Sequence, residues 1–185
     1  PEIEGVNSDH LNTNFSICTS MESLEKASDG VKYGKISDIP FVDFNIPSIL
    51  NENFAINNQH ILAASVQYAP YHLSNQIWDD QAKSILKTNT IKVIENIIPN
   101  FSNLIESSYV LSPQDIENEF GLKEGNLNHG EMTLDQFMFM RPTISSSQYS
   151  TPIKNLYICG GGTHPGGGLH GGNGYNAAKT ILNKW

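Results

Sequence analysis

The sequence predicts an α+β fold, and three features of its 185 residues support that prediction. Apolar and polar residues alternate over 61–71, which is the period of a half-buried strand. An apolar stripe at helical spacing follows over 78–98, with Pro99 after its end. A strand, a glycine-rich loop and a helix then close the chain over 155–185.

The first part of the chain predicts two strands on either side of a short helix. Residues 9–19 and 41–46 have the apolar patterns of strands. Between them, Thr19-x-x-Glu22 has the form of a capping box, in which two side chains satisfy backbone N–H groups at a helix start. Asp29-Gly30 predicts the end of this helix.

The strand over 61–71 and the helix after it supply most of the predicted core. Pro70 ends the strand or places it at a sheet edge, because proline has no N–H to donate to a neighbouring strand. The residues expected on the buried face of the strand are Leu62, Ala64, Val66 and Tyr68. The residues expected on the buried face of the helix are Ala82, Ile85, Leu86, Val93 and Ile97.

The later part of the chain alternates between helix and loop signals. Ser112-Pro113 predicts a capped helix start, and Gly121 follows that helix. After a polar stretch over 125–133, the apolar run 137–140 favours core over a cavity lining, and 145–151 predicts a loop. The residues expected to form the buried stripe of the last helix are Ala177, Ala178, Ile181, Leu182 and Trp185.

Composition limits the possible partners. The 11 Lys and Arg residues are scattered in a chain of net charge −8, whereas a nucleic-acid surface needs a basic stripe, so we expect no nucleic-acid partner. No apolar run approaches the length of a membrane span. Cys18 and Cys159 leave a disulfide open, but Cys159 lies in an apolar strand pattern and favours a reduced, buried side chain.

Nine of the fifteen glycines fall between Gly160 and Gly174, between the predicted strand and the last helix. Without Cβ atoms the backbone approaches a bulky ligand closely, and free N–H groups at a helix start favour an anion or a carbonyl oxygen. A flexible loop without a ligand is the alternative, and it is disfavoured because ordering many glycines costs entropy. The loop therefore predicts a ligand site.

Two nucleotide motifs match this loop only formally. Gly166-x-Gly168-x-x-Gly171 and Gly172-x-Gly174-x-x-Ala177 satisfy the dinucleotide fingerprint, but no second strand or ribose-binding acid follows them. A P-loop is excluded because no Gly-Lys-Ser/Thr is present. We expect the loop to form one wall of a nucleotide-type site that other segments complete.

Four stretches together resemble the phytoene-desaturase-like flavoproteins, which are related to amine oxidases. They are NLYICGGGTHPGGGLHG at 155–171, GNLNHGEMTLDQ at 125–136, Arg141-Pro142, and QYAPY at 67–71. The resemblance implies FAD as cofactor and a mixed or antiparallel sheet in a substrate domain. It also implies an FAD-binding domain whose N-terminal Rossmann half is absent from this chain, so that residues 1–140 belong to the substrate domain and 141–185 to the closing flavin segment.

The same resemblance assigns a cofactor role to residues of the glycine-rich loop. Backbone N–H groups near Gly172 would face the flavin O2, where a helix start stabilises negative charge on reduced flavin. Gly161 stands where amine oxidases carry a ribityl-binding acid, so a side-chain contact is not expected there. The predicted cofactor-binding residues are Gly160, Gly161, Gly168, Leu169, His170, Gly171 and Gly172.

Further candidates surround the loop in the sequence. The resemblance places His129 and Glu131 near the substrate face of the flavin, where they are candidate acid and base; hydrogen bonding of a loop onto the sheet is the equal alternative. Arg141 is expected to bind either FAD or a neighbouring carboxylate. The histidine spacing matches no zinc pattern, so no metal site is predicted.

The resemblance implies a parent enzyme that transfers a hydride between FAD and a small apolar or conjugated substrate. The alternative is an interaction or scaffold module that keeps the fold without flavin. We expect the isolated chain to be inactive and not to retain FAD, to need the N-terminal half of its own protein as partner, and to self-associate through exposed apolar surface. The sequence predicts no particular cellular compartment.

Overall fold

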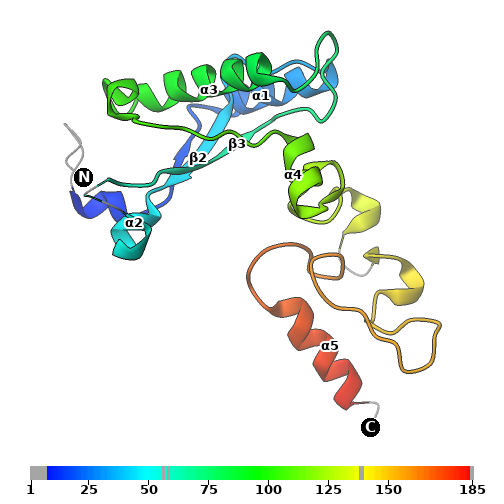
Figure 1. The fold of residues 1–185 in the computed structure, drawn as a ribbon. Coiled ribbons are helices and arrows are strands. Elements are labelled where there is room, and N and C mark those ends of the chain that lie inside the picture. The colour runs from blue at the N-terminus through cyan, green and yellow to red at the C-terminus, as the bar shows by residue number, and fades with distance from the viewer. Residues whose placement is uncertain (1–7, 56, 58, 138–139, 184–185) are drawn as a thin grey trace. The chain divides into compact units, whose positions relative to one another are not determined.

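A computed structural model describes residues 8–55, 57, 59–137 and 140–183. The chain divides into two compact units, Pro1–Pro113 and Gln114–Trp185, which are described separately below. A three-stranded antiparallel sheet and helices make up the first unit, which confirms the predicted α+β class (Figure 1). None of the described helices is both long and apolar enough to cross a bilayer.

The sheet of the first unit has the order β1-β2-β3, so that β2 is central. Strand β2 (Phe41–Asn45) pairs antiparallel with β1 (Phe15–Ile17) and with β3 (Ala63–Gln67). The predicted strand over 41–46 is therefore confirmed. The strand predicted over 61–71 is confirmed in part: β3 ends three residues before Pro70, and Ala64, expected on its buried face, is exposed. The strand predicted over 9–19 shrinks to three residues, because Ser8–Asn12 forms a 3-10 helix.

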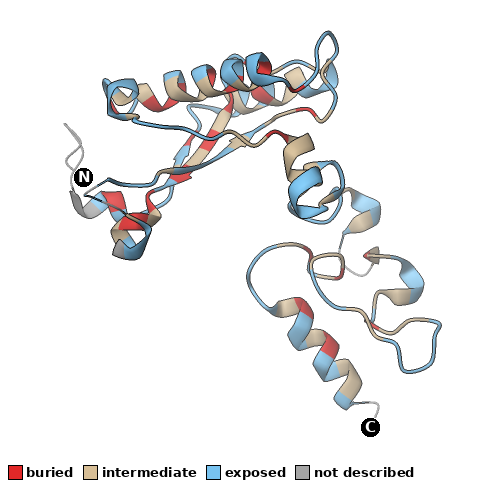
Figure 2. Ribbon diagram, viewed as in Figure 1, coloured by how far each residue is buried: buried red, intermediate tan, exposed pale blue. Residues whose placement is uncertain are grey.

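Helix α3 (Asp80–Glu95) covers one face of this sheet and completes the core (Figures 1 and 2). Its N-cap Asp79 accepts a hydrogen bond from the Ala82 N–H at 2.8 Å, which fixes the helix start. The main buried cluster joins sheet and helix through Ile17, Val42, Phe44, Val93, Ile94 and Ile98. A second cluster, of Trp78, Ala82 and Leu86, extends the core toward the helix start.

Two residues of the predicted helix stripe are not buried. Ile85 is 38% exposed and Ile97 is 41% exposed. The buried line of α3 instead passes through Ala82, Leu86, Asn89 and Val93, which leaves Ile85 on its flank. Ile97 follows the last helical residue, so it no longer shares the helix period. The polar Asn89 side chain can be buried at this position because its amide donates a hydrogen bond to the Ser37 carbonyl at 3.0 Å.

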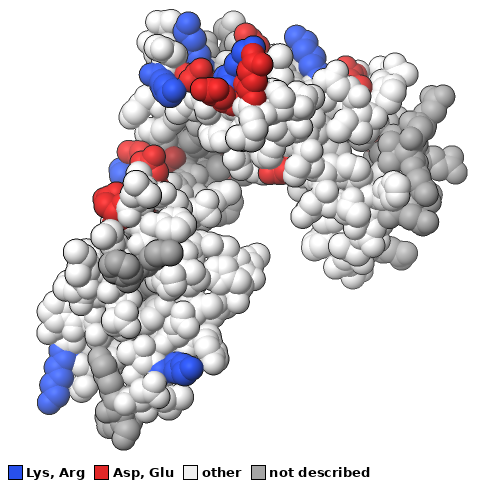
Figure 3. All heavy atoms as spheres, turned by 180° about the vertical axis from the view of Figure 1, so that it is seen from behind, with Lys and Arg blue, Asp and Glu red and all other residues white. Residues whose placement is uncertain are grey.

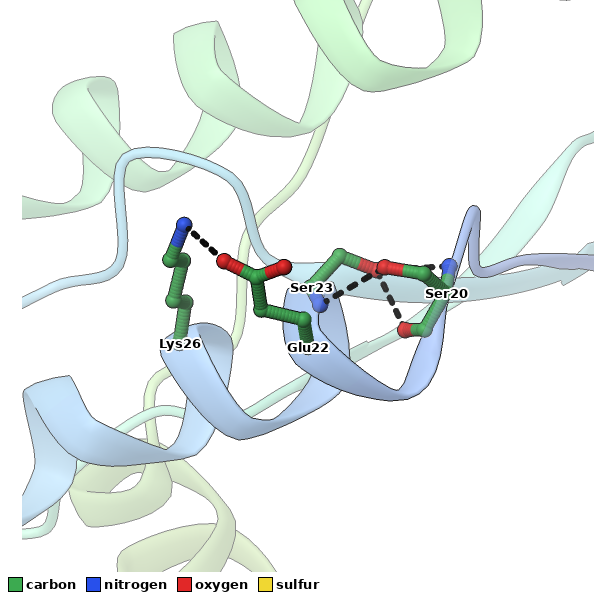
Figure 4. A network of polar contacts seen from close by, with 4 residues as sticks. All are labelled: Ser20, Glu22, Ser23 and Lys26. Atoms are coloured by element: carbon green, nitrogen blue, oxygen red, sulfur yellow. Dashed lines mark hydrogen bonds and ion pairs between the residues drawn. The ribbon is translucent and has the colours of Figure 1, made fainter.

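Helix α1 (Met21–Lys32) begins one residue later than the predicted capping box requires. Ser20 is the N-cap, and its side chain and that of Ser23 each accept the other residue's backbone N–H (Figure 4). Glu22, predicted to complete the box with Thr19, instead pairs with Lys26 one turn on, at 2.7 Å. The helix also continues past Gly30, where a Cβ would lie 2.9 Å from the Lys35 carbonyl oxygen.

The second unit contains α4 and α5 joined by irregular segments. Helix α4 (Pro113–Phe120) begins at the predicted proline and ends before Gly121, whose φ is +67°, as expected. Helix α5 is Gly172–Leu182. The predicted strand over 155–159 is wrong: it contains only one isolated antiparallel bridge, Ser150↔Tyr157. This segment does not extend into a strand because it pairs only with residues 149–151. In addition, Asn155 lies in a turn with φ +65°.

Several predicted core positions of this unit are exposed. In α5 the buried apolar residue is Ala177, whereas Ala178 and Leu182 are exposed. Asn173 and Asn176, which hydrogen bond with the rest of the unit, lie on the same side of the helix as Ala177. Phe137 is 47% exposed, and the rest of the predicted apolar run includes Met138 and Phe139, which, like Trp185, lie outside the described residues. Cys159, expected to be buried, is exposed, and it and Cys18 are both free thiols.

Candidate functional site

The glycine-rich loop, residues 160–171, leads directly into α5. Two tight turns shape it: the Thr163 N–H donates to the Gly160 carbonyl at 3.0 Å, and the Gly166 N–H donates to the Thr163 carbonyl at 2.7 Å. Four of its glycines have positive φ, which residues with a side chain rarely adopt. These four are Gly160 (+105°), Gly166 (+113°), Gly168 (+118°) and Gly171 (+67°).

Asn173 holds the loop together from the second position of α5. Its side chain is 5% exposed, and its amide nitrogen lies 2.8 Å from the Gly160 carbonyl oxygen, 2.9 Å from that of Thr163 and 3.1 Å from that of Gly166. One buried amide therefore turns three loop carbonyls inward. Sequence reasoning missed this residue because an asparagine inside a helix start resembles an ordinary capping residue.

A second segment, Asn128–Met132, lies against the loop and is called the covering segment here. A Cβ on Gly161 would lie 2.5 Å from His129 Cδ2, and one on Gly167 would lie 2.9 Å from Asn128 Cα. A Cβ on Gly166 would lie 3.2 Å from Met132 Cε. Close approach of the chain to itself therefore explains these three glycines, without any ligand.

Arg141 fixes the covering segment from beneath. It is 2% exposed, and its Nη2 donates to the carbonyl oxygens of Asn128 at 2.9 Å and His129 at 2.8 Å. Its Nη1 lies 2.8 Å from Met132 Sδ. Its Nε is buried and has no acceptor among the described residues. Of the two partners expected for Arg141, a neighbouring carboxylate is not found within the described part of the chain, where Arg141 contacts two main-chain carbonyls and a thioether.

Other glycines of the region face open space. Among the described residues, and apart from the neighbouring backbone of the chain, no heavy atom lies within 4 Å of a Cβ built on Gly160, Gly162, Gly171 or Gly174. Gly160 and Gly171 combine this open position with positive φ, so that both the backbone path and the absence of a side chain are required there. Of the predicted cofactor residues, these two present the bare backbone that a bulky ligand needs.

His170 occupies the place predicted for a ligand oxygen at the start of α5. Its Nδ1 accepts the Gly172 N–H at 3.0 Å, while its neighbour Leu169 is fully exposed. A Cβ on Gly168 would lie 3.1 Å from His170 Cδ2, and one on Gly172 would lie 2.9 Å from His170 Nδ1. The imidazole therefore covers these two glycines and caps one N–H of the helix.

The candidate acid and base are placed separately. His129 adopts φ +57° and rests its ring on Gly161, and Glu131 is exposed two residues later. No hydrogen bond between these two side chains is described. The structure thus brings His129, but not Glu131, against a predicted cofactor residue. Within the described part of the chain, no cluster of His, Cys, Asp or Glu is suited to hold a metal ion.

A shallow cleft of about 520 Å³ lies beside the same helix, away from most of the predicted cofactor residues. Tyr149 organises it, because the phenol donates to the His164 carbonyl at 2.9 Å and accepts from Asn176 at 3.0 Å. The cleft is lined by Ser147, Gln148, Tyr149, His164, Asn176, Lys179, Thr180 and Asn183. Sequence reasoning did not predict it, since its lining residues form no motif.

The residues present fit the FAD implied by the resemblance in two respects. Gly160, Gly162 and Gly171 leave open the space beside the loop backbone that a side chain would occupy. The Nε of the positively charged Arg141 is buried and has no hydrogen-bond acceptor among the described residues. Both features suit a bulky ligand that carries negative charge. The N–H of Gly172 suits a ligand oxygen only when His170 releases it.

Comparison with known proteins indicates an oxidoreductase family. No protein-family profile matches the chain. It is 37% identical over 174 residues to pyridine nucleotide-disulfide oxidoreductase domain-containing protein 2 of Rattus norvegicus, and equally to that of Mus musculus, over 94% of this chain and 29% of each relative. It is 35% identical over 130 residues to one of the limonene dehydrogenase subunits of Castellaniella defragrans, over 67% of this chain and 23% of that protein.

The chain thus spans 29% of the length of the first two curated relatives that it matches. Because the match extends over 94% of this chain, it includes both structural units and the glycine-rich loop. The relatives confirm that the four sequence motifs indicate an oxidoreductase family, while the phytoene-desaturase-like character stays a prediction. The chain belongs to the family of pyridine nucleotide-disulfide oxidoreductase domain-containing protein 2, of which it matches a part.

Proposed function

We propose that this chain is the C-terminal part of an FAD-dependent oxidoreductase. The observation that carries the proposal is the glycine-rich loop, whose open glycines with positive φ lead into the start of α5. The names of the relatives, an oxidoreductase domain protein and part of a dehydrogenase, support the same class of reaction. Residues 141–185 would then serve the cofactor, and residues 1–140 the substrate side.

Within this proposal, FAD supplies the hydride acceptor or donor when it is bound. Gly160, Gly162 and Gly171 give the ligand access to bare backbone, and Asn173 keeps the loop carbonyls turned away from it. The start of α5 favours negative charge on the ligand through the helix dipole. His170 yields the Gly172 N–H to a ligand oxygen, which makes this side chain a displaceable cap.

The substrate in this proposal is apolar or conjugated. The limonene named in one relative supports an apolar substrate. His129 is the best placed proton-transfer residue, because its ring rests on Gly161 while the residue itself is exposed. Glu131 serves as a second candidate on the same covering segment. Desaturation, saturation and isomerisation are the reaction types that fit a hydride transfer of this kind.

A pair of matched glycine variants tests the cofactor site. Gly171 and Gly121 both have φ +67° and both have no neighbour within 4 Å of a Cβ, but only Gly171 belongs to the glycine-rich loop. In the full-length protein, Gly171→Val is expected to lower the flavin content after gel filtration by tenfold or more. A tenfold loss of affinity corresponds to about 1.4 kcal/mol of binding free energy. Gly121→Val carries the same backbone strain and is expected to retain flavin.

The absorbance of flavin per protein chain is the measurement. Equal flavin content in the two variants would reject the assignment of the loop to FAD. A wild-type protein that binds no flavin at all would instead favour the alternative function, an interaction or scaffold module that keeps this fold without catalysis.

A further inference from the structure

Acidic residues are absent from the last part of the sequence. All 19 Asp and Glu residues lie before residue 137, whereas residues 137–185 contain four cationic side chains. Those four are Arg141, Lys154, Lys179 and Lys184. Figure 3 shows carboxylates gathered over the first unit and α4 on the face drawn. The segment that holds the glycine-rich loop is therefore cationic within a chain of net charge −8.

Arg141 is the buried member of this cationic set. The residue is 2% exposed, its guanidinium contacts carbonyl oxygens and a thioether, and no carboxylate of the described residues forms an ion pair with it. Its Nε is buried without an acceptor in the same described region. Removing a cation from water is unfavourable unless an anion compensates it, so this arrangement is incomplete by itself.

Two residues, His129 and Met132, each lie between the Arg141 guanidinium and the glycine-rich loop. His129, whose carbonyl accepts from Nη2, rests its ring on Gly161. Met132, whose sulfur lies 2.8 Å from Nη1, contacts the Cβ position of Gly166 at 3.3 Å through the same sulfur atom. A positive charge held here, in a region of low dielectric constant, favours negative charge on a ligand at the loop.

We propose that Arg141 and the glycine-rich loop form an oxyanion site, and that Arg141 makes this site select ligands bearing phosphate. The inference rests on the proposed function only for the source of the oxyanion, which would be the phosphates of FAD. Arg141 has two roles in this proposal. Its hydrogen bonds to two carbonyls hold the covering segment in place, and its positive charge favours ligands that bear phosphate. An inorganic phosphate chain is the alternative source of the same chemistry.

Three probes separate these sources: FAD, riboflavin, which has the same ring system without phosphate, and inorganic pyrophosphate. Each is titrated into the full-length protein and its variants, with flavin fluorescence as readout for the first two and calorimetry for the third. We expect FAD to bind more tightly than riboflavin. In Arg141→Gln, which retains an amide donor without charge, that preference is expected to fall by about tenfold, the effect of one charge-assisted interaction.

Two further variants complete the test. Arg141→Lys restores the charge without the planar fork, and it is expected to recover most of the FAD preference. Lys154→Met removes an exposed charge from the same acid-free segment and is expected to leave the preference unchanged. The ratio of the two flavin affinities is the deciding quantity, because a general loss of folded protein lowers both affinities together and leaves the ratio unchanged.

The outcomes distinguish this inference from the proposed function. An unchanged FAD-to-riboflavin ratio in Arg141→Gln would overturn the oxyanion site while leaving a flavin site intact. A wild-type protein that binds no flavin but binds pyrophosphate only when Arg141 is present would support the oxyanion site and reject the FAD proposal. Absence of pyrophosphate binding together with absence of flavin binding would reject both.

Discussion

At the scale of single residues, desolvation of the His60 ring, which lies beside Ser48, gives the first unit a pH-dependent stability. Ser48 is 2% exposed, and its Oγ accepts the Ile61 N–H at 3.1 Å and lies 3.0 Å from His60 Nδ1. This hydrogen bond holds the His60 ring against a buried hydroxyl. Desolvation lowers the pKa of His60 below its usual 6.5.

This lowered pKa predicts a loss of stability in mild acid. The folded state favours neutral His60, so the contribution is complete above pH 6.5 and decreases as the pH falls through the lower folded pKa. We expect the urea midpoint, followed by circular dichroism, to decrease between pH about 7.5 and about 5.5, and His60→Gln to reduce that slope. His72→Gln, which leaves the contact with Ser48 intact, serves as the control; an equal loss of slope in it would contradict the assignment.

The residues hardest to predict from sequence were those that bind main-chain groups. The acceptors of Arg141 among the described residues include the carbonyl oxygens of residues 128 and 129, and a carbonyl has no sequence signature; the expected contact with FAD stays a prediction. The same holds for Asn173 and its three loop carbonyls. The absence of acidic residues after residue 136 can be read from the sequence, but it does not indicate which cation is buried.

At the scale of elements, α3 determines the stability of the first unit because it buries the sheet. Ile94 is 2% exposed within the main core cluster, whereas Ile85 on the same helix is 38% exposed. Ile94→Ala is expected to lower the free energy of unfolding by about 2–5 kcal/mol, and Ile85→Ala by less than about 1 kcal/mol. Urea denaturation of the two variants measures the difference; equal losses would show that α3 does not pack as described.

Elements were predictable where local signals and packing agree. The Ser112-Pro113 start and the Gly121 end define α4 through backbone geometry alone, and the structure confirms both. The apolar run 155–159 resembles a strand, but a strand needs a long partner, and residues 149–151 provide only one bridge. Periodicity identifies which residues suit a strand, whereas pairing depends on segments distant in sequence.

At the scale of the whole molecule, the division into units differs from the predicted division by function. Compactness separates the chain after Pro113, while the predicted boundary between substrate and cofactor segments lies after residue 140. The covering segment, residues 128–132, falls between these two boundaries and contacts the glycine-rich loop. The functional boundary stays a prediction, and the variants of Arg141 and Gly171 address the part of it that concerns the cofactor.

The isolated 185-residue chain is expected to bind FAD far more weakly than the full-length protein. A dinucleotide gains affinity from contacts along its whole length, and one loop with one helix start supplies only part of them, so we expect a loss of several orders of magnitude. Titration followed by flavin fluorescence is the measurement. A yellow, stoichiometric complex that survives desalting would contradict this prediction and the proposed division of the site.

Asn173, which gathers the loop carbonyls, also makes the chain sensitive to ageing. It precedes Gly174, and in an Asn-Gly pair an unhindered backbone nitrogen readily displaces the side-chain amide, which is one reason why asparagine is thermolabile. In the folded chain this amide is buried, hydrogen bonded and part of a helix, so the displacement is hindered. Each opening of the loop removes that protection. An aspartate formed there would repel the same three carbonyls, so the deamidated fraction of a stored sample would record how often the loop has opened.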